Sequence, residues 1–264
     1  MIQEYKFISN IIHDNKGECY LVGGYVRNKL LNLNSKDYDI ATNLTPNIIK
    51  NIFKDYIISD YAYKYGNLIL SINNIRFEIT TYRIDYNSIN RKTNIEFTNN
   101  IIIDSNRRDF TINAIYYDTY TYYDYHNGIN DINNKIIKTI IDPYTSFKQD
   151  PLRMLRAIRF VGEYNFNIEP NTYNALLSNF NLLININKNS IYKELKKLIM
   201  SQYFIETFNK FQTLFSTIYP ELNKPINAII LDDNYKVRIK QLLIYFNIND
   251  DSLLYRDFPY IKNF

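Results

Sequence analysis

The sequence contains no tryptophan, a single cysteine and only two histidines. Cys19 has no second cysteine with which to form a disulfide inside the chain, and no cluster of histidine or cysteine surrounds it. A disulfide scaffold and a structural zinc site are therefore excluded, and we expect Cys19 to be a small buried residue. His13 and His126 stand apart from any pattern of acid and nucleophile, so we assign neither a catalytic role.

Long apolar runs are also missing. No run approaches the ~20 residues that cross a bilayer. Residues 1–16 carry acidic residues, lack an apolar core of signal-peptide length and contain no arginine of the kind that transit peptides use. We therefore expect a soluble protein of a reducing compartment with no membrane partner, located in the cytoplasm or, as the alternative, in an organelle.

Asparagine, isoleucine, lysine and tyrosine are abundant, with 26 tyrosines in 264 residues. Biased codon supply from an AT-rich genome explains this usage, so tyrosine stripes carry little functional weight. The net charge of +4 and the pI of about 8.8 suit a polyanionic partner but are too small for binding nucleic acid by charge alone.

Short helices and strands are expected to alternate up to residue 142. Periodicity and turn residues predict helices over 4–13, 25–33 and 47–53, strands over 19–22 and 36–41, a hairpin of 67–72 with 76–82 around Asn73-Asn74, and shorter pieces over 110–117, 121–125 and 135–140. The polar stretch 83–100 has little periodicity and predicts an exposed, mobile loop.

Helical periodicity takes over near Asp142-Pro143. Helices are expected over 150–164, 171–177, 190–200, 204–214 and 235–247. We therefore predict an α+β fold with two domains. Residues 1–142 form a head with a small mixed sheet and flanking helices, and residues 143–264 form an all-helical neck and body.

Two aspartates, Asp37 and Asp39, are separated by one residue in an apolar run. On a strand they share one face at roughly 6.5 Å spacing, with Tyr38 and Ile40 turned into the protein. The carboxylates repel each other unless a cation sits between them, although an exposed edge strand with two solvated acids is the alternative. Together with Glu78, from an apolar strand, they could hold two Mg²⁺ ions about 3.5–4 Å apart for phosphoryl transfer.

A glycine pair, Gly23-Gly24, stands between a predicted strand and a predicted helix. Glycine lets the backbone approach a ligand closely, and the helix that follows offers free N–H groups to an anion such as a triphosphate. Arg27 could add a charge-assisted contact. Taken alone the signal is weak, because Gly-Gly turns are common.

Four motifs in order resemble the class II tRNA nucleotidyltransferase and bacterial poly(A) polymerase family. They are Gly23-Gly24-Tyr25-Val26-Arg27, Asp37-Tyr38-Asp39, the run Arg107–Ala114, and Asp150-x-x-Arg153-x-x-Arg156-x-x-Arg159. The match covers residues 20 to about 165, and jointly the motifs are highly specific. The resemblance implies a nucleotidyltransferase head followed by a helical neck.

The resemblance also implies roles for individual residues. Asp37 and Asp39 would be catalytic metal ligands, and Glu78 the third catalytic carboxylate. The residues implied in nucleotide binding are Gly24, Arg27, Arg108, Asp150, Arg153, Arg156 and Arg159. Gly128 and Asp131 fit, more loosely, the flexible Gly-x-x-Asp segment that the family has between head and neck.

Asp150 and Arg153 fall where the family selects the incoming base. Cytosine and adenine both present an amino donor beside an unprotonated ring nitrogen, so a carboxylate and an arginine satisfy both bases, whereas guanine and uracil present the reverse polarity. In the alternative interpretation Asp150 caps a helix that has Pro151 at its first position, and the arginines form a solvated stripe. Arg107-Arg108-Asp109 could likewise be a surface ion-pair cluster, but the apolar Phe110–Ile115 segment that follows favours a ligand-facing turn.

Three features depart from the family pattern. Asn28 stands where the glycine-arginine motif usually continues with aspartate. The loop after Arg83, linked in the family to addition of the terminal A, is about two residues short, which keeps a CC-adding enzyme open. The helical region is reduced, so tRNA binding is expected to rest on basic residues of that region: Lys188, Lys193, Lys196, Lys197, Lys236, Arg238 and Lys240.

The hypothesis is therefore a Mg²⁺-dependent tRNA nucleotidyltransferase that adds C and A from CTP and ATP to tRNA 3′ ends. A CC-adding enzyme and a poly(A) polymerase are alternatives of the same class. A noncatalytic RNA-binding protein with a degenerate head is the alternative from another class, and the presence of all three carboxylates and of the basic helix argues against it.

Overall fold

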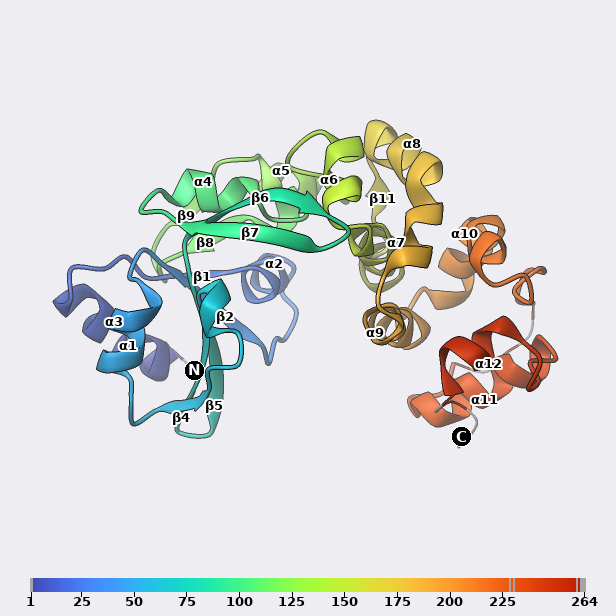
Figure 1. The fold of residues 1–264 in the computed structure, drawn as a ribbon, viewed down its shortest axis with the longest axis horizontal. Helices are drawn as coiled ribbons and strands as arrows, with labels where there is room; N and C mark the ends of the chain where they lie inside the picture. Colours follow the sequence, from blue (N-terminus) through green and yellow to red (C-terminus); the bar gives the residue numbers. More distant parts are fainter. Residues whose placement is uncertain (1, 228, 230, 260, 262–264) are drawn as a thin grey trace. The chain divides into compact units, whose positions relative to one another are not determined.

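The computed structural model describes residues 2–227, 229, 231–259 and 261, and its backbone divides into two compact units (Figure 1). The first unit comprises Met1–Asn87, Thr93–Asn134 and Lys138–Ile141. The second comprises Ser88–Lys92 and Lys135–Ile137 together with everything from Asp142 onward.

A seven-stranded mixed sheet forms the centre of the first unit, with the strand order β3-β4-β5-β2-β1-β8-β9. Its strands are β1 (Tyr20–Val22), β2 (Tyr38–Thr42), β3 (Ile57–Ser59), β4 (Asn67–Ile72), β5 (Ile75–Thr81), β8 (Ile115–Tyr117) and β9 (Tyr122–Asp124). β2 and β5 run parallel, and the other neighbours are antiparallel. The mixed sheet with flanking helices confirms the predicted fold class.

Short helices flank this sheet. They are α1 (Ile2–Asp14), α2 (Gly24–Leu30), α3 (Pro46–Ile52), α4 (Ile101–Asn106) and α5 (Gly128–Asn133), with the 3-10 turns η1 (Tyr63–Tyr65) and η2 (Thr111–Asn113). α1 buries Tyr5, Ile8 and Ile12, at the three-to-four-residue spacing that places side chains on one face of a helix. Cys19, just before β1, is 2 % exposed, which confirms the prediction, and burial raises the pKa of its thiol to about 12.

The predicted hairpin around Asn73-Asn74 is confirmed. β4 and β5 pair from Asn67 opposite Thr80 to Ile72 opposite Ile75. Asn73 and Asn74 have φ values of 50° and 63°, the left-handed conformation that asparagine tolerates and that a two-residue hairpin turn requires.

The prediction of a loop over residues 83–100 is wrong. β6 (Arg83–Ile89) and β7 (Lys92–Phe97) form a two-stranded ribbon, drawn in green in Figure 1, and Asn90 and Arg91 turn it with φ values of 50° and 68°. Most side chains of the ribbon are exposed or half-buried. Because neither face is continuously buried, the sequence has no apolar alternation that could mark the strands.

The second unit is mainly helical and contains one short two-stranded sheet. Its elements are β10 (Ile136–Ile137), α6 (Pro143–Gln149), α7 (Leu152–Tyr164), β11 (Asn167–Ile168), α8 (Pro170–Asn179), η3 (Phe180–Asn185), α9 (Lys188–Ile199), α10 (Phe204–Ile218), α11 (Tyr235–Tyr245) and α12 (Leu253–Asp257). The five predicted helices are present as α7 to α11, and α6 and α12 are additional. α6 is capped by Asp142, whose carboxylate accepts the Thr145 N–H at 2.8 Å, so the Asp142-Pro143 signal marked a helix start.

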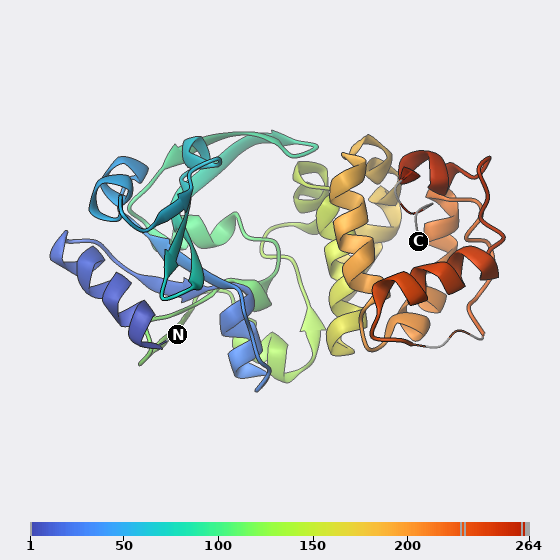
Figure 2. The same ribbon diagram turned by 90° about the horizontal axis from the view of Figure 1, so that it is seen from below.

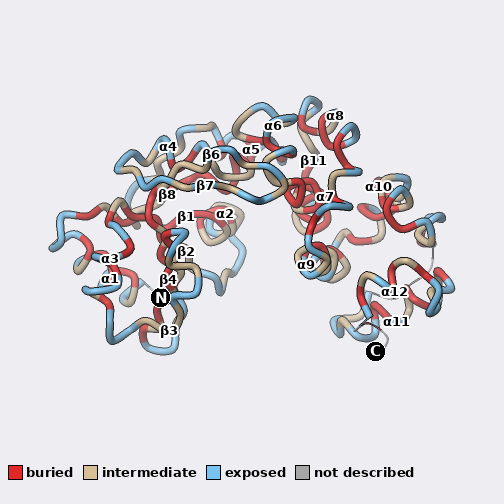
Figure 3. The backbone as a smooth tube through the Cα atoms, in the orientation of Figure 1, coloured by how far each residue is buried: buried red, intermediate tan, exposed pale blue. Residues whose placement is uncertain are grey.

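α7 is the most buried helix of this unit, as the red tube in Figure 3 shows, and it packs on α9. Gly162 permits this approach, since a Cβ there would lie 2.5 Å from the Ser201 hydroxyl and 2.9 Å from a methyl group of Leu198. Figure 2 shows the same helices, yellow to red, packed against one another.

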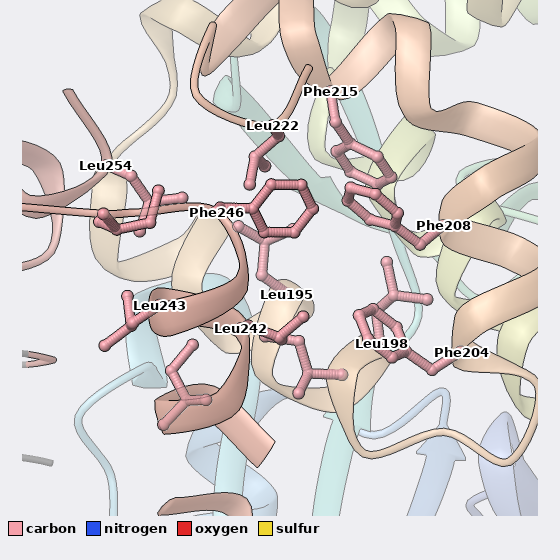
Figure 4. A pocket seen from close by; sticks show the side chains of 13 residues that line it. Leu195, Leu198, Phe204, Phe208, Phe215, Leu222, Leu242, Leu243, Phe246 and Leu254 are labelled. Atoms are coloured by element: carbon pink, nitrogen blue, oxygen red, sulfur yellow. The ribbon is translucent and has the colours of Figure 1, made fainter. Parts of the chain in front are cut away.

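Aromatic and aliphatic side chains from α9 to α12 form a separate apolar cluster around a cavity of about 70 Å³ (Figure 4). Phe208 stacks on Phe215 with ring centres 5.4 Å apart, and Phe246 lies 5.6 Å from Phe208. The periodic apolar positions of the sequence thus supply a core for this unit. Over the described residues, no helix combines the length and apolarity that a membrane span requires.

Candidate active site

Asp39 and Glu78 lie next to each other on neighbouring parallel strands. The register of β2 and β5 pairs Asp39 with Glu78, and β1 places Val22 beside Asp39 on the other side. Both acids line a cavity of about 220 Å³, whose other lining residues are Val22, Ile40, Asn67, Thr80, Arg83, Arg107 and Arg108. The sheet therefore brings two of the three predicted carboxylates into one polar recess.

Asp37 precedes β2, which begins at Tyr38, so only Asp39 of the pair lies within the strand. Asp37 is exposed and lines a second cavity, of about 300 Å³, together with Asp39, Glu78, Tyr38 and Arg76. Ile40 is fully buried, and the Tyr38 ring lies 5.4 Å from that of Phe77. The predicted alternation along this segment is therefore present, although the strand starts one residue after Asp37.

The Gly23-Gly24 turn lies against Asp39. Gly23 has φ 72° and ψ −136°, a conformation that residues with a side chain rarely adopt. A Cβ on Gly23 would lie 3.0 Å from the Asp39 Oδ2 atom. The glycine is thus required both by the turn from β1 into α2 and by the close approach to the carboxylate.

Arg27 links the first motif to the Arg107–Ala114 run. Its side chain is buried; Nη1 donates to Asn113 Oδ1, and Nη2 donates to Asn28 Oδ1 at 3.1 Å. Asn113 in turn donates to Asp109 at 2.9 Å. Asn28 therefore accepts from Arg27 as the family's aspartate could, but without adding a negative charge.

Arg107 and Arg108 are anchored by Asp104, which sequence reasoning missed. Arg107 Nε donates to Asp104 Oδ1 at 2.9 Å, and Arg108 Nη2 donates to Oδ2 at 3.1 Å. Arg108 Nε also donates to the Tyr116 hydroxyl at 3.0 Å. The signal was present in the sequence, because Asp104 precedes the two arginines by three and four residues, the spacing of neighbours on one helical face.

Asp104 is fully buried and still ionised. Burial raises its pKa, but the Arg108 and Arg107 guanidinium groups and the Tyr116 hydroxyl outweigh burial and lower the pKa to about 2. Asp104 neutralises part of the positive charge of Arg107 and Arg108 and fixes both guanidinium groups. Because this acid is buried, the group is not a surface ion-pair cluster. Arg107 and Arg108 also line the cavity of Asp39 and Glu78.

Asp150 lies between α6 and α7 in the second unit. Its Oδ1 atom accepts the Leu152 N–H at 3.0 Å and lies 3.4 Å from Arg91 Nε. Burial raises the pKa of Asp150, and Arg91 and Arg153 oppose that effect. The Asp150 carboxylate therefore accepts a hydrogen bond from the start of α7, as the helix-cap interpretation predicted. It also pairs with Arg91, a partner that the sequence did not reveal.

The three arginines of α7 do not form a solvated stripe. Arg153 is 9 % exposed and donates to the Ser146 hydroxyl at 2.7 Å. Arg159 is 5 % exposed, and its Nε atom lies 2.6 Å from Glu194 of α9. Arg156 is half-buried and lies 3.7 Å from the same glutamate. The three arginines thus contact polar side chains of the neighbouring helices α6 and α9.

The Gly128 and Asp131 segment forms α5. Asp131 accepts the Thr111 hydroxyl at 2.6 Å, and a Cβ on Gly128 would lie 2.2 Å from the Thr111 carbonyl oxygen. Gly128 is therefore needed for the contact of α5 with η2.

One of the predicted phosphate contacts is buried. Arg238 is 5 % exposed and donates to the carbonyl groups of Ile199 at 2.8 Å and Ser201 at 3.3 Å, so it satisfies the end of α9 instead of facing RNA. Lys188 is half-buried and pairs with Asp257 at 2.7 Å. The exposed lysines of this set are Lys193, Lys196, Lys197, Lys236 and Lys240.

The described residues contain no group of three or more His, Cys, Asp or Glu side chains close enough to hold a metal ion by themselves. Asp39 and Glu78 nevertheless fit a hard divalent cation, since both offer carboxylate oxygens into a polar recess. Magnesium in nucleotide-transfer sites is characteristically held by one or two carboxylates with substrate phosphates and waters completing the shell.

Comparison with known proteins agrees with this geometry. The "Poly A polymerase head domain" family model matches residues 19–138, and the "Probable RNA and SrmB- binding site of polymerase A" model matches residues 165–224. The chain belongs to the class II tRNA nucleotidyltransferase and poly(A) polymerase family. Enzymes of this nucleotidyltransferase family generally use divalent metals.

Relatives in the family include the CCA-adding enzymes of Staphylococcus aureus strain bovine RF122 / ET3-1, 35 % identical over 217 residues, and of Staphylococcus epidermidis, 36 % identical over 204 residues. These matches cover 81 % and 76 % of this chain but 54 % and 50 % of the relatives, so the chain spans about half the length of the curated relatives it matches.

A solved relative is the Bacillus stearothermophilus CCA-adding enzyme in complex with CTP. It matches with a TM-score of 0.82 at 27 % identity and covers 99 % of this chain and 66 % of that chain. The Thermotoga maritima CCA-adding enzyme, solved with tRNA_CCA, shares the fold with a TM-score of 0.69 at 22 % identity over 93 % of this chain and 57 % of that one.

Proposed function

We propose that this protein adds C and A from CTP and ATP to the 3′ ends of tRNA without a nucleic-acid template and releases pyrophosphate. The observation that carries the proposal is the pairing of Asp39 with Glu78 beside the Gly23 turn, within the head domain of a nucleotidyltransferase family. Relatives about 35 % identical that bear the name CCA-adding enzyme support the same activity. We assign residues 1–142 to the head and 143–264 to the helical neck and body, with segments 88–92 and 135–137 of the first range packed in the helical unit.

In this proposal Asp37, Asp39 and Glu78 are the catalytic carboxylates, and Mg²⁺ is the metal that they hold. When bound, the metal would supply charge neutralisation at the phosphates and acidify the attacking 3′ hydroxyl. Gly24 and Arg27 would bind the triphosphate. Arg108 would bind ribose or phosphate. Because Asp104 already orients its side chain, binding would cost little additional side-chain entropy.

The choice of base is proposed to rest on Asp150 and Arg153. A carboxylate and a guanidinium group match the amino donor and the ring acceptor that cytosine and adenine share. Arg153 is buried and Asp150 is half-buried, which supports selectivity, because a base of reverse polarity leaves partly desolvated groups unpaired. Arg156 and Arg159 would support this helix and the nucleotide it faces.

The tRNA partner is proposed to contact the exposed lysines of α9 and α11. Lys193 and Lys197 on α9 and Lys236 and Lys240 on α11 are exposed and suit contacts with phosphates, which give affinity and little sequence preference. Since tRNA is the proposed substrate, we expect the protein to act where tRNA is processed, in the cytoplasm.

The test is incubation of the protein with Mg²⁺, tRNA lacking CCA, and single labelled nucleotides. We expect CMP to be incorporated first and AMP only after both C residues are present. Asp39→Ala should abolish incorporation, and Asp55→Ala, which removes an exposed acid elsewhere in the same unit, should retain it. No incorporation of either nucleotide by the wild-type protein would refute the proposal.

The length of the product separates the related activities. Addition that stops after two C residues identifies a CC-adding enzyme, and a long A tract identifies a poly(A) polymerase. Binding of tRNA without any incorporation identifies a noncatalytic RNA-binding protein.

A further inference from the structure

Asn67 stands on the same sheet face as the carboxylate pair. It is the first residue of β4 and lies directly opposite Thr80 of β5, while Glu78 lies between Ile69 of β4 and Asp39 of β2. Residues in register or two apart on paired strands share a face, so Asn67, Glu78 and Asp39 form one polar row across three strands. All three line the cavity of about 220 Å³.

The Asn67 amide is committed to its neighbours on β5. Its Nδ2 atom donates to Glu78 Oε1 at 2.5 Å and to Thr80 Oγ1 at 3.0 Å. An ionised carboxylate only accepts hydrogen bonds, so the nitrogen and not the oxygen of the amide must face Glu78. The backbone also fixes this residue, because the Asn67 N–H donates to Ala62 and Gly66, with φ 81°, sets the entry into β4.

The donor is neutral, which has an electrostatic consequence. A lysine or arginine at this position would also satisfy a Glu78 oxygen, but its charge would compete with a cation for the carboxylates. Asn67 satisfies one oxygen and fixes the carboxylate's orientation while leaving the negative charge of Asp39 and Glu78 in place. Hydrogen bonds that orient a metal-binding carboxylate strengthen metal binding in proteins generally.

We propose that Asn67 is a positioning residue that holds the Glu78 carboxylate in the orientation required for binding a divalent cation together with Asp39. The inference rests on the proposed function in that Asp39 and Glu78 are taken as two of the metal-binding carboxylates. Asn67 itself acts through Glu78 and transfers no proton.

The experiment measures Mn²⁺ binding to the full chain by electron paramagnetic resonance, without nucleotide or tRNA. Asn67→Leu keeps the size of the side chain and removes both donors, and Asn67→Ser keeps one donor. Ser71→Ala, on the same strand and face, is the matched control. Thermal unfolding followed by circular dichroism reports whether each variant folds.

We expect Asn67→Leu to weaken Mn²⁺ binding by at least about tenfold, Asn67→Ser to weaken it less, and Ser71→Ala to leave it within about twofold of the wild type. The Mg²⁺ concentration for half-maximal CMP incorporation should rise in the same order. A folded Asn67→Leu protein with wild-type Mn²⁺ affinity would overturn the inference. If that variant does not fold, Asn67→Ser decides, and an affinity equal to that of Ser71→Ala overturns it.

These outcomes differ from a failure of the proposed function. A wild-type protein that binds no Mn²⁺ refutes the metal site and the role of Asn67 together. A protein that binds Mn²⁺ and loses affinity in Asn67→Leu, but incorporates no nucleotide, supports the role of Asn67 and refutes CCA addition.

Discussion

The Tyr116 hydroxyl donates a 2.7 Å hydrogen bond to the buried Asp104 carboxylate, and the same hydroxyl accepts one from Arg108. Tyr116 therefore links the acid and the base of one ion pair through a single oxygen atom. Its ring also lies beneath the Arg108 guanidinium group, with the centre 5.0 Å away. Arg108 is thus oriented by three contacts, with the Asp104 carboxylate, the Tyr116 hydroxyl and the Tyr116 ring, before any ligand binds.

Asp104→Asn should destabilise the protein by about 3 kcal/mol, because it removes the buried negative partner of two half-buried arginines. Tyr116→Phe removes both hydrogen bonds of the hydroxyl and should cost about 2 kcal/mol. Urea unfolding measures both changes. A loss below 1 kcal/mol for Asp104→Asn would show that the ion pairs contribute little to folding.

The free energy of unfolding should decrease in acid because Asp104 becomes protonated. The folded-state pKa of Asp104, about 2, lies below the value of about 3.8 for a free aspartate, so its contribution is present above pH 4 and is lost as the pH falls toward 2. The shift corresponds to about 2–3 kcal/mol. Unfolding free energies measured between pH 5 and pH 2 should decline less steeply in Asp104→Asn than in the wild type.

Glu194→Gln should loosen the packing of α7 on α9. The wild-type glutamate is buried and contacts both Arg159 and Arg156, so losing its charge should cost about 3 kcal/mol. Glu163→Gln is the matched control, because Glu163 pairs with Arg159 as its one basic partner among the described residues and is more exposed, and should cost about 1 kcal/mol or less. Equal losses in thermal melts of the two variants would contradict the central place of Glu194.

Gly23→Ala should lower both stability and nucleotide incorporation. The backbone conformation of Gly23 costs a residue with a side chain about 1–3 kcal/mol, and the added methyl group would press on Asp39. Gly24→Ala meets only an ordinary contact, 3.6 Å from Arg27, and should melt close to the wild type. Melting curves of the two variants, measured side by side, check the expected difference.

Regular periodicity made most of the helices and the 67–82 hairpin predictable. α8 to α11 repeat apolar residues at helical spacing because one side of each helix is buried, and Asn73-Asn74 has the turn chemistry that its hairpin requires. The ribbon of β6 and β7 could not be found in this way, since backbone pairing holds it with little burial. Its turn at Asn90-Arg91 gave only a local hint.

In the candidate site, too, local sequence patterns could be predicted and long-range contacts could not. Motifs local in the sequence identified Asp37, Asp39 and the Arg107–Asp109 turn. Asp39 and Glu78 are 39 positions apart, and they become neighbours only through the register of β2 and β5. The proximity of Asp39 to Gly23 likewise depends on the turn at the end of β1. The exposure of basic side chains could not be inferred from the sequence. Arg238 was expected on the surface because it is charged, yet it is buried and donates to a carbonyl group at the end of α9.

The interleaving of the two units along the chain limits how either can be exchanged. Residues 88–92 and 135–137 belong to the helical unit, and the second of these segments supplies β10, the partner of β11. A fragment cut at residue 142 would carry β11 into solution with an unpaired edge. Recombination between relatives, in nature or by design, should therefore preserve function when the helical unit is inherited with residues 135–137 and not when the junction falls at the Asp142-Pro143 boundary.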